Sequence, residues 1–334
     1  MTLTSYYEFM ADICSPTWNS NTSVGNPQEL SIEQLWNSPK AQEIRRSVLN
    51  ETFDFCNTDI CWRILEGKLE RRDEVKDPVM RNIIKNNITV IPGGPEFINI
   101  AYNPVCNLYC RMCRDERIVQ MDEKHKNKTI SDLKNYKFFN LKRLIIPGSG
   151  ELFANKDYIE LLQNINEEQF PKLEAIWINS NGVLFNERNW NKISHLSSRY
   201  KIKVFISTDS VCKETFTKIR RGGNYASFKD NLKTVRELRH RGEISKLYFA
   251  FCVQRINFRE MSEFVSFAHE NGADSVHFEK LFHAPISECV HRPENVYYDD
   301  FVCELKKAIG KGRKLGIDVE AKPFMDVVRR NHLA

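Results

Sequence analysis

Hydrophobic and polar residues alternate in six short segments of the chain from about residue 95 onward. The alternation occurs in 97–102, 143–147, 175–179, 203–207, 247–253 and 275–279. Hydrophobic positions recur at helical spacing in 155–167, 187–197, 226–241, 258–271 and 297–316. Strands that alternate with helices predict a parallel sheet with right-handed crossovers. Six such units are too few for a closed eight-stranded barrel. We therefore predict an α/β fold, a partial (β/α)6 TIM-like barrel over residues 95–334, with active groups after the strand C-termini.

The first 75 residues follow a different pattern. Turn-forming residues dominate the start, and Ser31 is placed to cap a helix that begins in "SIEQLW". Pro39 is placed to open a second helix, "PKAQEIRRSVLN". We predict a small, mainly helical domain over residues 1–75 and a helical connector over residues 76–94.

Composition and charge narrow the class of protein. The chain has 334 residues, of which 41% are hydrophobic and 28% charged, so it is long enough to bury a substantial core. The net charge of +5 permits an anionic substrate but does not require nucleic acid. No apolar run approaches the roughly 18–20 residues that span a bilayer, and "MTLTSYYEFM" lacks the features of a signal peptide. We expect a cytoplasmic protein without nucleic-acid or membrane partners.

Ten cysteines in a reducing compartment favour metal ligation or catalysis over disulfides, at least where they cluster. Cys106, Cys110 and Cys113 have the spacing C-x3-C-x2-C directly after the first predicted barrel strand. A structural zinc site needs four ligands. Three thiolates can instead hold three irons of an iron–sulfur cluster and leave the fourth iron open. A zinc site completed by a distant residue, or chance, remains an alternative on spacing alone.

Five further motifs follow in order, about one for each strand–helix unit. After "INIAYNPVCNLYCRMC" come "IIPGSGELF", "WINSNGVLF", "VFISTDS" with "TKIRRGG", and "FAFCVQRINFREM". This series, over most of residues 95–280, resembles the radical S-adenosylmethionine (radical SAM) enzymes. Two departures are mild: Leu152 replaces the usual proline after Glu151, and Met112 replaces the usual aromatic residue before the third cysteine.

The resemblance implies the chemistry and the binding residues. The three cysteines would hold a [4Fe–4S] cluster whose open iron binds the amino and carboxylate groups of S-adenosylmethionine. One electron, from a reductant such as flavodoxin or ferredoxin, would then produce a 5′-deoxyadenosyl radical that abstracts a substrate hydrogen atom. Arg220 would lie near the carboxylate, and Ser207 and Asp209 near the ribose. The full set of implied S-adenosylmethionine-binding residues is Met112, Gly148, Ser149, Gly150, Glu151, Asn181, Ser207, Asp209, Arg220 and Asn257.

Residues 30–61 resemble the later part of SPASM or twitch domains, which carry ligands of an auxiliary [4Fe–4S] cluster. Here the region precedes the barrel, whereas in most relatives it follows, so the order is permuted. The resemblance implies that Cys14, Cys56 and Cys61 hold a second [4Fe–4S] cluster. Cys289 is the proposed fourth ligand, and an open site that binds substrate is the alternative. A zinc knuckle or three unliganded thiols is the simpler interpretation.

The remaining cysteines are weighed singly. Cys212 follows the fourth strand and could donate a hydrogen atom to a substrate radical, or it is an ordinary loop residue. Cys252 and Cys303 are expected in the core. Glu279 ends the sixth strand as a possible substrate anchor or an ordinary strand-end carboxylate.

Three hypotheses concern the function of the protein. We expect a radical SAM enzyme, an oxidoreductase, in redox tailoring (dehydrogenation or epimerisation) of a small molecule such as a sugar or cyclitol. No segment resembles the winged-helix type that captures leader peptides. The alternative is a peptide-modifying (RiPP-type) maturase or epimerase, and the third hypothesis is a non-catalytic iron–sulfur or zinc-binding protein.

Overall fold

A computed structural model describes residues 1–4, 10–14, 22–58, 61–65, 67–121, 133, 135–281 and 285–332. The chain forms two compact units. Unit 1 comprises residues 1–104, 121–149 and 164–174, and unit 2 comprises residues 105–120, 150–163 and 175–334. The first two barrel strands thus belong to the same unit as the N-terminal residues. The predicted domains, 1–75, 76–94 and 95–334, stay a prediction.

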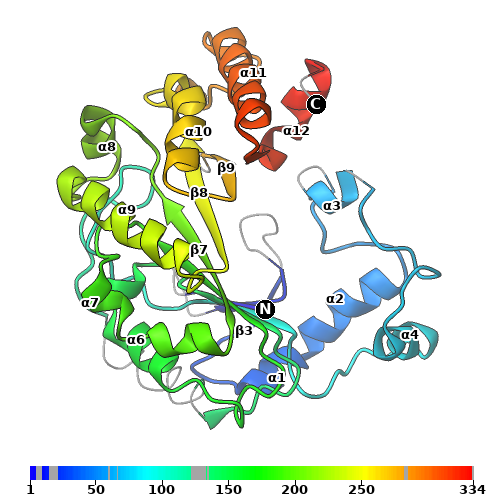
Figure 1. Cartoon of the computed structure of the whole chain (residues 1–334). Helices are drawn as coiled ribbons and strands as arrows, with labels where there is room; N and C mark the ends of the chain where they lie inside the picture. Colours follow the sequence, from blue (N-terminus) through cyan, green and yellow to red (C-terminus); the bar gives the residue numbers. More distant parts are fainter. Residues whose placement is uncertain are drawn as a thin grey trace. The chain divides into compact units, whose positions relative to one another are not determined.

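The helices among the described residues of unit 1 are α1 (Ile32–Trp36), α2 (Pro39–Leu49), α3 (Trp62–Leu65) and α4 (Pro78–Lys85). Helices α1, α2 and α4 begin where the sequence indicated, and α3 was not predicted. Ser31 caps α1 in a reciprocal capping box with Gln34. Ser38 accepts a hydrogen bond from the Ala41 amide, and Pro39 takes the first position of α2. Figure 1 shows α1 and α2 in blue, one after the other along the chain.

Unit 1 also contains five strands, β1 (Thr2–Thr4), β2 (Met10–Asp12), β3 (Ser23–Gly25), β4 (Phe97–Ala101) and β5 (Arg143–Ile146). β4 lies between β5 and β1 and is parallel to both, whereas β2 pairs antiparallel with β1 and β3. The sequence predicted β4 and β5 but not β1–β3. Strands of three residues are too short to show an alternating pattern, so their pairing partners define them.

Unit 2 holds the other four predicted strands and one more. β6 (Ala175–Ser180), β7 (Lys201–Ser207), β8 (Lys246–Val253), β9 (Ser275–Lys280) and the unpredicted β10 (Asp318–Glu320) form parallel neighbours in that order. The helices are α6 (Lys156–Gln163), α7 (Glu187–Trp190), α8 (Lys213–Ile219), α9 (Tyr225–His240), α10 (Met261–Glu270), α11 (Tyr298–Leu315) and α12 (Met325–Arg330). All six predicted barrel strands are present, and from β5 to β9 they alternate with helices, which confirms the α/β fold class.

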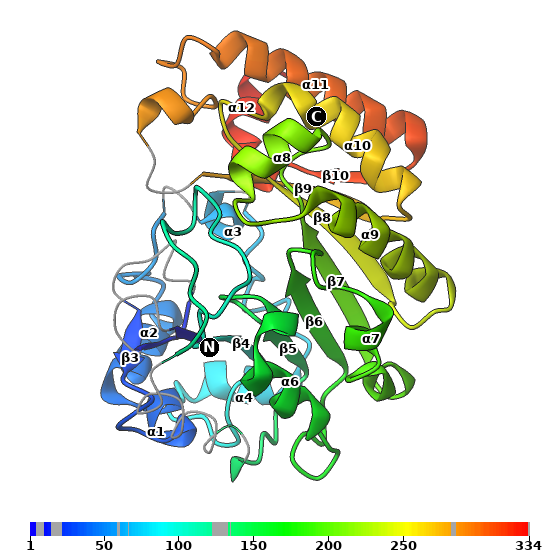
Figure 2. The ribbon, with the colours of Figure 1, turned by 90° about the vertical axis from the view of Figure 1, so that its left-hand side faces the viewer.

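The helices of unit 2 cover one face of its sheet, and the contacts identify that face. Phe249 on β8 and Phe278 on β9 both pack against Phe264 of α10. Figure 2 shows α9 and α10 on the same side of β7 and β8. Side chains that alternate with these, such as Phe205 and Tyr248, therefore point to the opposite face, which we call the inner face.

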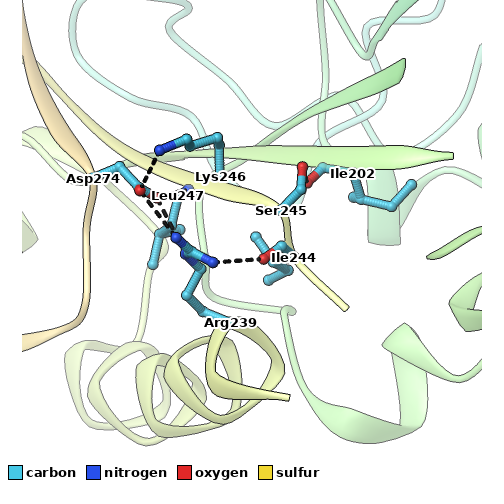
Figure 3. Close-up of polar contacts among 7 residues, drawn as sticks. All are labelled: Ile202, Arg239, Ile244, Ser245, Lys246, Leu247 and Asp274. Carbon is cyan, nitrogen blue, oxygen red and sulfur yellow. Dashed lines mark hydrogen bonds and ion pairs between the residues drawn. The ribbon is translucent and has the colours of Figure 1, made fainter. Parts of the chain in front are cut away.

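A polar junction joins three elements at the start of β8. Asp274, in the turn before β9, accepts two hydrogen bonds from Arg239 of α9, at 3.0 and 3.1 Å (Figure 3). It also accepts from the Lys246 ammonium at 2.8 Å and the Leu247 amide at 2.9 Å. Burial opposes ionisation, but these donors outweigh it and hold the pKa of the Asp274 carboxyl below its ordinary value.

Candidate functional site

The three-cysteine loop, residues 105–120, belongs to unit 2 and is fixed by backbone hydrogen bonds. The Cys106 amide donates to the Ile118 carbonyl at 2.9 Å, which closes the loop on itself. The Cys113 amide donates to the Cys110 carbonyl at 2.8 Å in a tight turn. Cys110 is buried, Cys106 half-buried and Cys113 exposed. The three thiols therefore range from the interior to the surface of one loop.

The segment that follows α8 holds this loop in place. Backbone amides of Tyr109 and Arg111 donate to the carbonyls of Arg221 and Ile219, at 3.1 and 3.0 Å. In return, the Arg221 side chain donates to the carbonyls of Tyr109 and Arg114, both at 2.9 Å. The sequence motifs indicated no role for Arg221 in the site. Its side chain buttresses the loop.

Two loops of unit 2, the cysteine loop and the loop after β6, meet around Cys106. The Asn181 side chain, just after β6, donates to the side-chain oxygen Oδ1 of Asn107 at 2.8 Å and lies 3.8 Å from the Cys106 sulfur. Fully buried Glu151 accepts from the Ser180 hydroxyl at 2.8 Å and from the Asn181 amide at 2.7 Å. Burial, then the nearby Glu151 carboxylate, raises the pKa of the Cys106 thiol to about 11. A thiol in this environment needs a positive partner, such as a metal, to ionise at neutral pH.

A buried ion pair stands beside Cys110. The Arg220 guanidinium contacts the Asp209 carboxylate at 2.6 Å, and the two side chains are 9% and 2% exposed. Another nitrogen of Arg220 lies 3.7 Å from the Cys110 sulfur. Asp209 has a positive φ of 64° and also accepts from the Cys252 amide at 2.7 Å. Arg220 and Asp209, both predicted near S-adenosylmethionine, are thus brought together next to a predicted cluster ligand.

Asn257 and Ser207 lie close to this pair. The Asn257 amide nitrogen donates to the carbonyls of Asp209 and Cys252, both at 2.9 Å, and its oxygen accepts from the Gln254 amide at 2.7 Å. Asn257 therefore ties the loop after β8 to the loop after β7. Ser207 is half-buried at the C-terminal end of β7.

The glycine-rich motif after β5 has one position where only glycine fits. A Cβ atom on Gly148 would lie 2.3 Å from the Asn99 side-chain oxygen. Ser149 is buried and Gly150 has a φ of 79°. In unit 2, the Glu151 amide donates to the Val105 carbonyl at 2.9 Å, directly before the cysteine loop. Met112 is half-buried within that loop.

The arrangement of thiols fits a cluster better than a single ion. Among the described residues, no three His, Cys, Asp or Glu side chains converge on one point as ligands of one metal ion would. A [4Fe–4S] cluster does not require that, because each thiolate binds a different iron. Each thiol also acts electrostatically on the next along the loop, Cys106 with Cys110 and Cys110 with Cys113. Their spacing and the donors around them suit a cluster with three cysteine ligands.

The three cysteines of the N-terminal region lie in unit 1, and two of them act on the third. Burial, and after it the neighbouring Cys14 and Cys61 thiols, raises the pKa of the Cys56 thiol. The Cys61 amide donates to the Asn57 carbonyl at 2.9 Å, so the chain turns between the two later cysteines. The predicted fourth ligand, Cys289, is buried in unit 2 at the end of a short 3-10 turn, Ile286–Glu288.

Of the remaining cysteines, Cys303 does not lie where the sequence predicted. Cys303 is exposed on α11, so its predicted core position is wrong. The buried residues Phe301, Leu305 and Ala308 define the packed face of that helix, and a residue two positions after Phe301 points about 200° away. Cys252 is half-buried on the inner face of β8, beside Asp209. Cys212 is half-buried, and its amide donates to Ser210 and Glu260 at the start of α8.

In the part of the chain that the structure describes, no helix is both long and apolar enough to cross a membrane.

Comparison with protein families gives one match across half of the chain. Residues 100–268 match the family model described as the Radical SAM superfamily. A curated relative, a probable GTP 3′,8-cyclase of Methanococcus maripaludis, is 28% identical over 144 residues, which are 42% of this chain and 45% of the relative. The chain thus spans less than half the length of that relative.

Solved structures show weaker similarity. Streptococcus suis SuiB bound to S-adenosylmethionine is 15% identical, with a TM-score of 0.47, over 84% of this chain and 64% of that one. Native anSMEcpe with bound AdoMet and a peptide is 17% identical, with a TM-score of 0.48, over 67% of this chain and 63% of that one.

Proposed function

Because the chain belongs to the radical SAM superfamily, we propose that it cleaves S-adenosylmethionine reductively and uses the resulting radical to abstract a substrate hydrogen atom. The observation that carries this proposal is the fixed C-x3-C-x2-C loop of Cys106, Cys110 and Cys113. In this loop Cys110 lies beside a buried ion pair and Cys106 beside a buried carboxylate, Glu151. An open-site [4Fe–4S] cluster with S-adenosylmethionine bound supplies the 5′-deoxyadenosyl radical.

The protein's own residues would bind and orient the cluster and S-adenosylmethionine, and would exclude water from the site. Cys106, Cys110 and Cys113 would hold the cluster. Glu151 is the buried acceptor for the amino group of the methionine moiety, a role supported by its position beside Cys106. The other proposed contacts to S-adenosylmethionine are Met112, Gly148, Ser149, Gly150, Asn181, Ser207, Asp209, Arg220 and Asn257. Because Asp209 and Arg220 bind each other, either they rearrange when the ligand enters or they act from behind it.

We further propose a second [4Fe–4S] cluster held by Cys14, Cys56 and Cys61, with Cys289 as fourth ligand. The effect of the Cys14 and Cys61 thiols on the pKa of the Cys56 thiol supports the first part of this proposal. The reductant would be a flavodoxin or a ferredoxin.

For the reaction we propose redox tailoring, dehydrogenation or epimerisation, of a small molecule such as a sugar or cyclitol. The name of the curated relative gives a nucleotide as its substrate, which supports a small molecule. Peptide modification is the second candidate. SuiB, which has been solved with its precursor peptide, favours it. In an epimerisation, Cys212 is the proposed hydrogen-atom donor.

The test is made on protein that is purified and reconstituted without oxygen. Wild type should form 5′-deoxyadenosine from S-adenosylmethionine when a reductant is added. A Cys106→Ala/Cys110→Ala/Cys113→Ala variant should lose about four irons and all cleavage. Cys303→Ala, at an exposed thiol, is the matched control and should retain both. Wild-type protein that binds iron at this loop without cleaving S-adenosylmethionine would refute the proposal.

A further inference from the structure

The inner face of unit 2 carries a group of half-buried rings. Phe205 of β7 is at its centre: its ring centroid lies 4.4 Å from that of Tyr248, 5.7 Å from that of Trp177 and 5.3 Å from that of His277. These four residues come from four successive strands, β6–β9. All four are half-buried, whereas the rings on the helix-covered face, such as Phe249 and Phe278, have no exposed surface.

Short side chains follow this aromatic group toward the cluster loop. One step along the inner face from the register partners Phe205 and Tyr248 stand Ser207 and Ala250, which are also register partners. A step further, the Cys252 amide donates to Asp209, the partner of Arg220. Small residues thus stand between the rings and the ion pair on this face, and the Lys203 ammonium lies 4.7 Å from the centroid of the Trp177 ring.

Two buried polar atoms beside Phe205 have no hydrogen-bond partner among the described residues, the indole nitrogen of Trp177 and Nε2 of His277. A buried polar group without a partner is destabilising, so a native protein retains one where a ligand or water uses it. The indole nitrogen is a donor. Burial lowers the pKa of His277, and its Nδ1 faces the Glu320 carboxylate at 3.9 Å. A neutral ring with its proton on Nδ1 leaves Nε2 as an acceptor.

A hydroxyl group accepts a hydrogen bond from an indole and donates one to an imidazole, so a ligand with several hydroxyls can satisfy both atoms. The carboxylates of Glu279 and Glu320 extend the same face with further acceptors for hydroxyl donors. The faces of Phe205 and Tyr248 suit the C–H surface of a saturated ring.

We propose that the inner face around Trp177, Phe205, Tyr248 and His277 binds the substrate, and that the substrate is a hydroxylated saturated ring, a sugar or a cyclitol. The inference rests on the proposed function, since it places the substrate on the strand face that leads to Asp209 and the cysteine loop. Trp177 and His277 orient the hydroxyls, and the rings of Phe205 and Tyr248 exclude water beneath them.

Binding is tested apart from turnover. Reconstituted protein with S-adenosylmethionine, but without reductant, is titrated in a calorimeter with myo-inositol, with methyl β-D-glucopyranoside and with an unmodified peptide. At least one of the two polyols should bind. Trp177→Phe, which keeps the ring and removes the N–H, should weaken that binding about five- to tenfold, the loss of roughly one hydrogen bond. Phe205→Ala should weaken it further.

Phe139→Ala, which removes an exposed ring in unit 1, is the matched control and should leave binding unchanged. Wild type that binds neither polyol, binds only the peptide, or binds a polyol equally well after Trp177→Phe overturns the inference. Formation of 5′-deoxyadenosine in the same wild-type preparation separates the two proposals. Cleavage without polyol binding leaves the proposed function standing, whereas an absence of cleavage refutes that function whatever the calorimeter shows.

Discussion

At the scale of single residues, the Arg220 guanidinium lies between a carboxylate and a thiol and contacts both. One nitrogen contacts Asp209 at 2.6 Å and another lies 3.7 Å from the Cys110 sulfur. Donors and positive charge beside a cluster ligand favour the reduced, more negative state. We therefore expect Arg220→Met to shift the midpoint potential of the reconstituted cluster to more negative values, as measured by a redox titration followed by electron paramagnetic resonance.

Arg221→Gln is the control for this prediction, because Arg221 binds loop carbonyls and not a thiol. It should leave the potential unchanged. Removing Arg220 alone leaves Asp209 buried and unpaired, which costs about 3–5 kcal/mol. An Arg220→Met/Asp209→Asn variant therefore provides a second, better balanced measurement. An unaltered potential in both variants would show that Arg220 does not act on the cluster.

At the scale of elements, Asp274 joins the C-terminal end of α9 to the start of β8 and the turn before β9 (Figure 3). Asp274→Asn keeps the shape but loses the charge-assisted bonds. We expect the free energy of unfolding at neutral pH to fall by about 2 kcal/mol, measured by chemical denaturation. Asp230→Asn on the same helix, at an exposed pair with Lys233, should cost at most about 0.5 kcal/mol.

The same carboxylate predicts a pH dependence. Its pKa in the folded protein lies below the ordinary value of 3.8. The unfolded chain therefore binds this proton first as pH falls. The stabilisation is complete above the unfolded pKa and is lost as pH falls through the lower folded pKa. Wild type and Asp274→Asn should thus converge in stability in strongly acidic solution, and a constant difference at all pH values would contradict this account.

At the scale of the whole molecule, the three cysteines of unit 1 are the proposed ligands of a second cluster. A Cys14→Ala/Cys56→Ala/Cys61→Ala variant should lose about four of about eight irons and keep the cluster of the Cys106 loop. Iron analysis of anaerobically reconstituted protein measures this. Cys289→Ala tests the fourth ligand, and it should weaken iron retention in the same way. A wild-type protein that holds only about four irons would refute the second cluster.

The sequence by itself determined what depends on local patterns. The six barrel strands, most of the helices that alternate with them, the cap at Ser31, the helix start at Pro39, and the grouping of Cys106, Cys110 and Cys113 follow from periodicity, capping chemistry and spacing within a few residues. Each of these features is encoded in a continuous segment, so neighbouring residues suffice to predict it.

Only the tertiary structure decided which distant groups meet. β1, β2, β3 and β10 are three-residue strands that exist because a partner strand pairs with them. Arg220 contacts Cys110 across 110 positions of the chain. Cys303 is exposed although its segment is amphipathic, since the packed face of α11 lies on its other side. Pairing and burial between segments far apart in sequence depend on the whole fold, and no local pattern records them.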